Sequence, residues 1–87
     1  MKTMYFIIKY SWCADVGAGD IVKCIIGEDG RVHTFVKHKD SDRFKSKYWG
    51  LRGFDESNML NKLNSHWGTK YLQFENTNYS EIAVELI

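Results

Sequence analysis

The side chains best suited to bind metals or to act as nucleophiles are few, three histidines and two cysteines among 87 residues. A zinc site needs four such groups, and natural sites keep paired cysteines about two to four residues apart. Cys13 and Cys24 are eleven residues apart. His33 and His38, on one extended stretch, point to opposite sides because five is an odd number of steps along a strand. The spacing predicts no metal site, with His66 and the other histidines as ordinary surface residues.

Catalytic groups are equally sparse. Cys13 would act as a nucleophile only if the fold placed a histidine beside it, and no family signature surrounds it. The run GAGD, residues 17–20, has neither the G-x-G-x-x-G pattern of dinucleotide sites nor the lysine of a phosphate-binding loop. We therefore expect no enzyme and no cofactor. The aspartates in loops are explained by turn formation, and they are Asp15, Asp20, Asp40 and Asp42.

The stretch KSKYWGLRGF, residues 45–54, combines basic, aromatic and glycine residues ahead of a predicted helix. Trp, Tyr and Arg dominate hot spots in protein interfaces, and glycines let a loop adopt unusual backbone geometry. We expect Tyr48, Trp49 and Arg52 to face solvent as anchors for a larger protein or a nucleoprotein complex, whereas Leu51 and Phe54 are equally suited to the core. The candidate binding residues are Arg43, Lys45, Lys47, Tyr48, Trp49 and Arg52.

The alternative is a nucleic-acid-binding module that uses the basic aromatic segment, residues 37–54. Its cations would neutralise phosphates while Phe44, Tyr48 and Trp49 stack on bases. The order of three strands, Gly-Phe and an acid-started helix, carried by RGFDES, also resembles small DNA-binding modules such as AP2-type domains and the arm-binding domains of phage-type integrases. The resemblance spans residues 20–67 and implies DNA binding, while two further predicted strands and a pI near 7.8 depart from it.

Charge is unevenly placed along the chain, although the net charge is only +1. Residues 1–36 carry four basic and four acidic residues, residues 37–52 carry six and two (net +4), and residues 53–87 carry two and five (net −3). The sequence leaves open whether the last two segments neutralise each other in the fold or stay apart. If they stay apart, the acidic segment could enter a basic nucleic-acid channel on a target, as a DNA mimic does.

A hairpin over residues 21–38 is the clearest predicted element. A three-residue loop that ends in a left-handed Gly30 pairs Ile26 with Val32, whereas a two-residue turn would pair Ile26 with His33. The first register keeps apolar residues together, so we prefer it. The predicted core face is then Val22, Cys24, Ile26, Val32, Thr34 and Val36.

Three further strands and a helix complete the prediction. A strand over residues 4–12 is apolar on both sides and should lie inside the sheet. A helix should begin at Asp55, which can cap it, and end at Gly68. Strands over residues 69–75 and 81–87 follow, and the last could close a homodimer. The residues expected to face the core are Met4, Phe6, Ile8, Tyr10 and Trp12, then Met59, Leu60, Leu63 and Trp67, and then Leu72 and Phe74.

Together these elements predict a single α+β domain over residues 1–87. It is a mainly antiparallel sheet of about five strands packed on one side by a single helix, in the order β-β-β-α-β-β, with residues 43–54 irregular or weakly stranded before the helix. Lys9 interrupts the first apolar run before it reaches signal-peptide length, and no run approaches the ~20 apolar residues of a membrane span. We expect a cytoplasmic protein without membrane contact.

Size, near-neutral charge and surplus aromatic residues favour a small non-enzymatic protein-binding domain. In general style the chain resembles accessory proteins of phages and mobile elements that inhibit host defences such as CRISPR effectors. In a cytoplasm both cysteines would be reduced, although a disulfide stays open because connectivity cannot be read from sequence.

Overall fold

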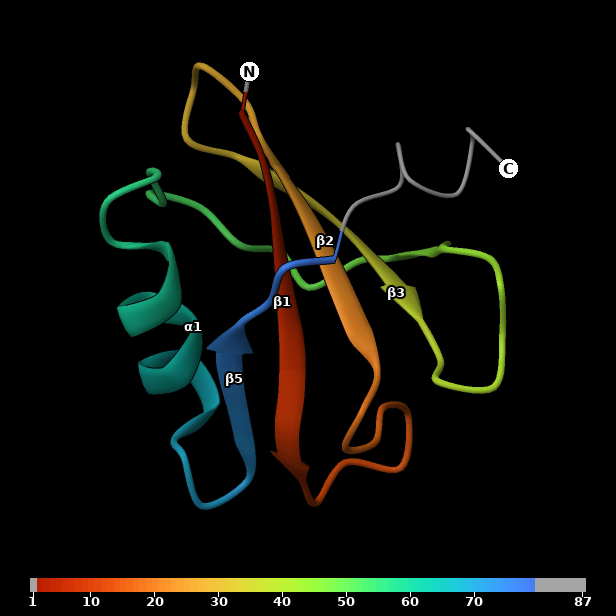
Figure 1. The fold of residues 1–87 in the computed structure, drawn as a ribbon. Coiled ribbons are helices and arrows are strands. Elements are labelled where there is room, and N and C mark those ends of the chain that lie inside the picture. Colours follow the sequence, from red (N-terminus) through yellow and green to blue (C-terminus); the bar gives the residue numbers. More distant parts are fainter. Residues whose placement is uncertain (1, 80–87) are drawn as a thin grey trace.

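The computed structural model describes residues 2–79, which form one five-stranded sheet and one α-helix. All strand pairs are antiparallel, and the helix lies along one edge of the sheet (Figure 1). The class is α+β, as the sequence predicted. In chain order the elements are β1 (Lys2–Ser11), β2 (Ile21–Ile26), β3 (Val32–Lys37), β4 (Lys45–Lys47), α1 (Met59–Trp67) and β5 (Leu72–Asn76).

The strands lie side by side in the order β4-β3-β2-β1-β5, so β1 is an inner strand, as predicted. In the β2–β3 hairpin, Ile26 pairs with Val32 and Val22 pairs with Val36, which confirms the register with a three-residue loop. Gly30 in that loop has a φ of +83°, a conformation that side chains other than glycine rarely adopt. All the predicted core-face residues of the hairpin are buried except Val32, which is partly buried.

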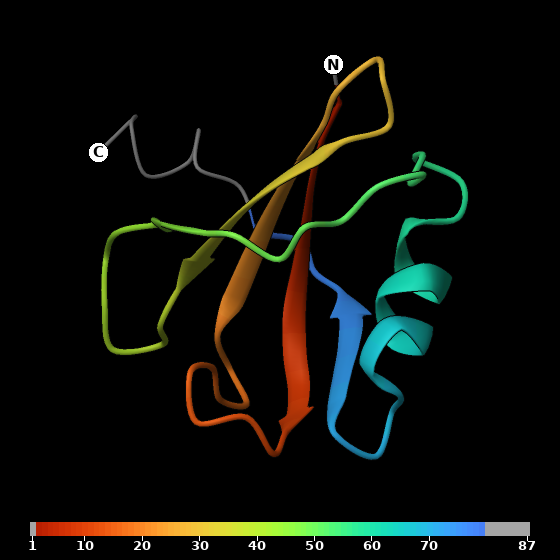
Figure 2. The same ribbon diagram turned by 180° about the vertical axis from the view of Figure 1, so that it is seen from behind.

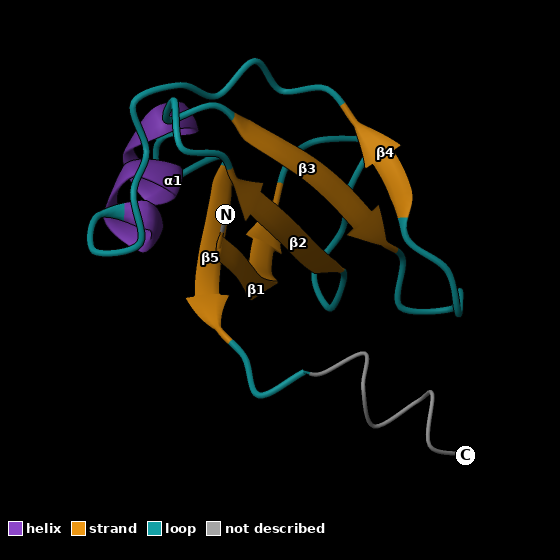
Figure 3. Ribbon diagram, turned by 90° about the horizontal axis from the view of Figure 1, so that it is seen from above, coloured by secondary structure: helices purple, strands orange, loops and turns teal. Residues whose placement is uncertain are grey.

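The hydrophobic core lies between one face of the sheet and a layer formed by α1 and the chain that precedes it (Figure 3). Met59 and Leu63 are fully buried on the inner side of α1, and Leu60 and Trp67 pack at the margin of the core. This is the face that helical spacing predicted. Burying it against the sheet is what stabilises so short a helix.

The contact between α1 and β5 includes a pair of hydrogen bonds from one side chain. The Asn64 amide nitrogen donates to the carbonyl oxygen of Phe74 (3.2 Å), and its oxygen accepts from the Phe74 amide (2.7 Å). Phe74 and Leu72 are buried, as predicted. Asn64 thereby satisfies backbone groups of an edge strand that would otherwise be open to water.

The end of β1 departs from the prediction. A β-bulge between Ile8 and Tyr10 shifts the register against β5, so that Tyr10 pairs with Gln73, whose side chain points away from the core. Phe6 and Ile8 are buried, but Tyr10 is 41% exposed and Trp12 is 74% exposed. The prediction that the last two face the core is wrong, because strict alternation cannot anticipate an extra residue in the strand.

The helix begins at Met59, four residues after the predicted start. Asp55 caps a turn instead of the helix, since its Oδ1 accepts the backbone amides of Ser57 (2.9 Å) and Asn58 (3.0 Å). Asp55 therefore accepts backbone amides as predicted, but those of the turn that precedes α1 and not those of the helix itself. Gly68, with a φ of +85°, ends the helix as predicted.

The chain between β4 and α1 crosses the core face of the sheet (Figure 2). Two backbone hydrogen bonds attach it to the tip of the β2–β3 hairpin: the Val32 amide donates to the Leu51 carbonyl (3.2 Å), and the Phe54 amide donates to the Gly30 carbonyl (3.4 Å). Leu51 and Phe54 are 2% and 6% exposed. Both are core residues, which decides the alternative that the sequence left open.

Residues 45–47 form the short edge strand β4, in which Lys45 pairs with Val36 and Lys47 pairs with Thr34. Within residues 2–79 the element order is therefore β-β-β-β-α-β. This differs from the predicted order because the segment before the helix was expected to be irregular or only weakly stranded. The strand predicted over residues 81–87, and the homodimer contact through it, lie outside the described residues.

Candidate binding site

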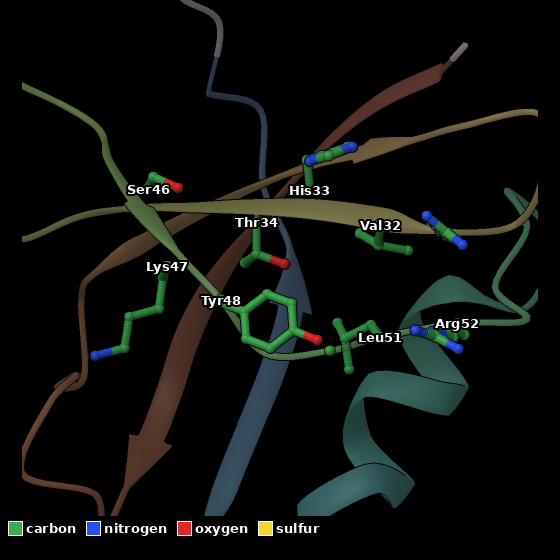
Figure 4. Close-up of a pocket in the computed structure, with 10 residues that line it drawn as sticks. Val32, His33, Thr34, Ser46, Lys47, Tyr48, Leu51 and Arg52 are labelled. Atoms are coloured by element: carbon green, nitrogen blue, oxygen red, sulfur yellow. The ribbon is translucent and has the colours of Figure 1, made fainter.

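A pocket of about 220 Å³ opens between β3, β4 and the chain that follows β4. In Figure 4, Thr34, Tyr48 and Leu51 lie on one side of β3, whereas His33 points to the other, as alternation along a strand requires. Among residues 2–79, no acidic side chain lines the pocket. The lining residues that matter here are Arg31, Thr34, Lys47, Tyr48 and Arg52.

Tyr48 and Arg52 are the two predicted anchors that the structure exposes. Tyr48 is 88% exposed, and its phenol ring lies beside the backbone of Gly50, which has a φ of +65°. Arg52 is exposed and makes no hydrogen bond or ion pair with any other residue in the range 2–79. A guanidinium without an internal partner is available to a carboxylate or phosphate from another molecule.

Thr34 supplies a polar group at the closed side of the pocket. The residue is 3% exposed, and within the described chain its Oγ1 has no hydrogen-bond partner. A buried hydroxyl left in this state costs about 1 to 3 kcal/mol. The hairpin pattern predicts Thr34 on the core face but does not predict a binding role for it. Two features of the sequence could have indicated one: Thr34 is the only hydroxyl residue on an otherwise apolar face, and Arg31 lies just after the hairpin loop.

Trp49, the third predicted anchor, is partly buried rather than exposed. Its indole packs edge to face on Trp67, with ring centroids 4.9 Å apart, and on Phe74 at 6.1 Å. The expectation that it faces solvent is wrong because the chain after β4 crosses the core face, so that Trp49 and Leu51 both turn toward the core. Trp49 belongs to the framework that positions Tyr48.

The aromatic platform required by the nucleic-acid alternative is dispersed. Phe44 lies on the opposite face of the sheet, against Tyr5 (6.1 Å between centroids) and Tyr79 (5.6 Å). Trp49 is in the core layer, and only Tyr48 is open to solvent. The three rings therefore do not form one surface on which successive bases could stack.

The cations of the predicted site are mostly exposed. Arg43 and Lys45 face solvent, and the Lys47 ammonium donates to the Asp15 carboxylate at 2.9 Å. No ion pair joins residues 37–52 to residues 53–79. Ion pairs thus do not neutralise the basic segment against residues 53–79, and the remaining acidic residues of the C-terminal segment, Glu81 and Glu85, lie outside the described residues.

The acidic residues of this C-terminal part have partners of their own. Glu56 lies 3.3 Å from the Lys2 ammonium, and Glu75 lies 2.8 Å from the Lys9 ammonium. Asp55 is occupied by the turn before α1, and these hydrogen bonds, with Ser57 first, lower its pKa. In the range 53–79 the acidic groups therefore do not form an unopposed anionic surface of the kind that a DNA mimic presents.

A second hollow, of about 610 Å³ and open to solvent, is lined by Cys13, Asp20 and His38 among others. Asp20 Oδ2 lies 2.8 Å from His38 Nδ1 and accepts the Gly17 amide (2.8 Å), while Oδ1 accepts the Lys39 amide (3.0 Å). A thiol and an oriented histidine thus share one surface, but no hydrogen bond in the described chain joins Cys13 to His38. The hydrogen bond to Gly17 is the local turn that the sequence predicted, whereas the contacts with His38 and Lys39 connect a second loop and were not predicted.

The two thiols should differ sharply in reactivity, because both cysteines are free but only Cys13 is exposed. Burial raises the pKa of the Cys24 thiol to about 12. We expect an aromatic disulfide reagent at pH 8 to label one thiol, Cys13, in the native protein and the second only after unfolding. If His38→Ala slowed the labelling of Cys13 severalfold, the histidine would act as its base, contrary to a non-enzymatic role.

In the range 2–79, no three His, Cys, Asp or Glu side chains gather in a group that could hold a metal ion. The helix found there is neither long nor apolar enough to cross a bilayer.

Comparisons of the chain with protein-family models, with curated proteins and with solved structures found no match. The resemblance to small three-strand DNA-binding modules therefore gains no support from them. The pocket and its exposed neighbours, Tyr48 and Arg52, are the features of the described chain that bear on function.

Proposed function

We propose that the chain is a small, non-enzymatic protein-binding domain, and that its binding surface is the pocket with its exposed neighbours Tyr48 and Arg52. One observation carries the proposal: a tyrosine that is 88% exposed lines the same pocket as an exposed arginine with no internal partner in residues 2–79. These residue types supply much of the binding energy in protein interfaces. In the described chain neither side chain is buried, so a partner surface that covered the Tyr48 ring would gain the free energy of burying it.

The framework behind these two side chains supports the same proposal. Leu51 and Trp49 fix the chain to the core on one side, and Gly50 provides the left-handed turn between them. Anchors held on a fixed backbone lose little conformational entropy on binding. The finer role we propose is that of a phage or mobile-element protein that inhibits a larger host protein, such as a CRISPR effector, by occupying part of its surface.

Nucleic acid is the second candidate, because the cations along residues 37–52 would suit phosphates. The dispersal of Phe44, Tyr48 and Trp49 argues against stacking on single strands. Binding to a duplex backbone through charge alone would be nonspecific and steeply salt-dependent. We therefore rank it below a protein partner.

Tyr48→Ala and Arg52→Gln should each lower capture of the partner from host lysate about tenfold or more, because each removes a side chain of the hot-spot type. Both should leave the free energy of unfolding within about 0.5 kcal/mol of wild type, since neither residue packs in the core. The measurement is affinity capture with and without nuclease, read by quantitative mass spectrometry.

Two exposed residues at the turn before β5 give matched controls, Tyr71→Ala and Lys70→Gln, which should capture normally. Equal capture by Tyr48→Ala, Arg52→Gln and wild type would refute the proposed surface. Loss of all captured protein after nuclease treatment would instead assign the surface to nucleic acid.

A further inference from the structure

Building on the proposed function, we infer that the pocket receives a single carboxylate side chain, a glutamate or aspartate, from the partner protein. Thr34 Oγ1 would donate to it from the closed side, and the Arg52 guanidinium would pair with it at the mouth. Thr34, whose buried Oγ1 has no hydrogen-bond partner in residues 2–79, and Arg52, whose guanidinium has none there either, line the same pocket. The ligand would satisfy both.

The charge of the pocket selects an anion. Its ionised lining residues are Arg31, Lys47 and Arg52, and no carboxylate of the described chain lines it. Arg31 is shared with Asp29 (3.4 Å) and Lys47 with Asp15 (2.9 Å). Both are therefore largely neutralised by these partners, and Arg52 is left to make the direct contact, for which a planar guanidinium suits a planar carboxylate.

The volume of the pocket and its apolar lining suit the end of one amino-acid side chain better than a nucleic-acid backbone or a cofactor. Its volume, about 220 Å³, is below the roughly 300 to 1,000 Å³ of sites for drug-sized molecules. Val32, Leu51 and the Tyr48 ring supply apolar surface for the methylene groups of a glutamate. A phosphodiester is flanked by sugars on both sides and cannot insert an end to reach a hydroxyl as deeply buried as that of Thr34.

The test is a ¹H–¹⁵N NMR titration of the whole chain with a short glutamate-rich peptide, and with its glutamine counterpart as the uncharged control. We expect shift changes from the glutamate peptide alone, concentrated in residues 32–34 and 48–52. Thr34→Val should weaken the peptide about fivefold or more by removing the donor, and Thr34→Ser should restore much of the affinity. Arg52→Gln should weaken it similarly, whereas Lys70→Gln should not.

Thr34→Val also has a thermal readout that a purely structural hydroxyl would not give. If Oγ1 is unsatisfied until a carboxylate arrives, the substitution should raise the melting temperature by about 4 to 8 °C while lowering peptide affinity. A lower melting temperature with unchanged peptide affinity would mean that Thr34 serves the fold and would overturn the inference. So would binding of oligothymidylate at this site in preference to the peptide.

The outcomes separate this inference from the proposed function. If Tyr48→Ala and Arg52→Gln lose the partner but Thr34→Val captures it normally, the protein-binding surface stands and the carboxylate site fails. If the glutamate peptide binds through Thr34 while Tyr48→Ala and Arg52→Gln capture normally, the site stands and the proposed interface fails.

Discussion

Replacing Trp49 by alanine should lower the free energy of unfolding by about 2 to 3 kcal/mol. Truncating a fully buried aromatic residue to alanine lowers the free energy of unfolding by about 3 to 5 kcal/mol, and we expect less here because Trp49 is only partly buried. The indole nevertheless holds two edge-to-face contacts, with Trp67 and Phe74, that no other side chain would replace. Urea unfolding followed by circular dichroism would measure the change.

Tyr48→Ala is the matched control, because it removes a neighbouring aromatic ring that is 88% exposed and should change stability by no more than about 0.5 kcal/mol. A Trp49→Ala protein as stable as wild type would mean that the indole does not support the core. The pair also decides how binding data are interpreted: lost capture by Trp49→Ala would follow from a weakened framework, whereas lost capture by Tyr48→Ala would not.

The sheet was largely predictable, because burial on one face imposes a two-residue period on the sequence. The alternation from Val22 to Val36 fixed both the hairpin register and the loop that contains Gly30. The strand β4 could not be predicted in this way, because Lys45, Ser46 and Lys47 show no alternation of apolar and polar residues. They form a strand because β3 presents an unpaired edge to them, a tertiary cause that is not local to their sequence.

The exposure of Tyr48 and Arg52 was predicted correctly, whereas that of Trp49 was not, for a simple geometric reason. In an extended segment neighbouring side chains point to opposite sides, so Tyr48 and Trp49 were never free to face solvent together. Counting back from Leu51, a strong core residue, would have placed Trp49 inward and Tyr48 outward. Thr34 could be placed on the core face from sequence, but its lack of a partner depends on which atoms the fold brings near it.

Asp20→Asn should lower the free energy of unfolding by about 2 kcal/mol at pH 7. The carboxylate is 4% exposed and accepts three hydrogen bonds, from the Gly17 amide, the His38 ring and the Lys39 amide. An asparagine has one acceptor oxygen where the carboxylate uses two, so at least one amide N–H would face the new NH₂ group without an acceptor. A buried donor left in this state costs about 1 to 3 kcal/mol.

The same residue gives the wild type a pH dependence whose sign follows from its pKa. Burial alone would raise the pKa of Asp20, but the hydrogen bonds from Gly17, His38 and Lys39 together outweigh it and hold the pKa below the ordinary 3.8. The unfolded chain therefore takes up this proton at a higher pH than the folded one. The stabilisation is complete above about pH 5 and is lost as the pH falls through the folded-state value.

Measured by urea unfolding, the gap in stability between wild type and Asp20→Asn should narrow as the pH falls from 5 toward 3. Asp42→Asn removes the same charge from a side chain that is 96% exposed, so it should show neither the destabilisation nor the pH-dependent gap. Because the carboxylate joins the loop before β2 to the turn after β3, its loss should also broaden the amide signals of both loops at pH 7. A gap that widened on acidification would mean that Asp20 is held protonated in the folded chain, which three donors around one carboxylate should prevent.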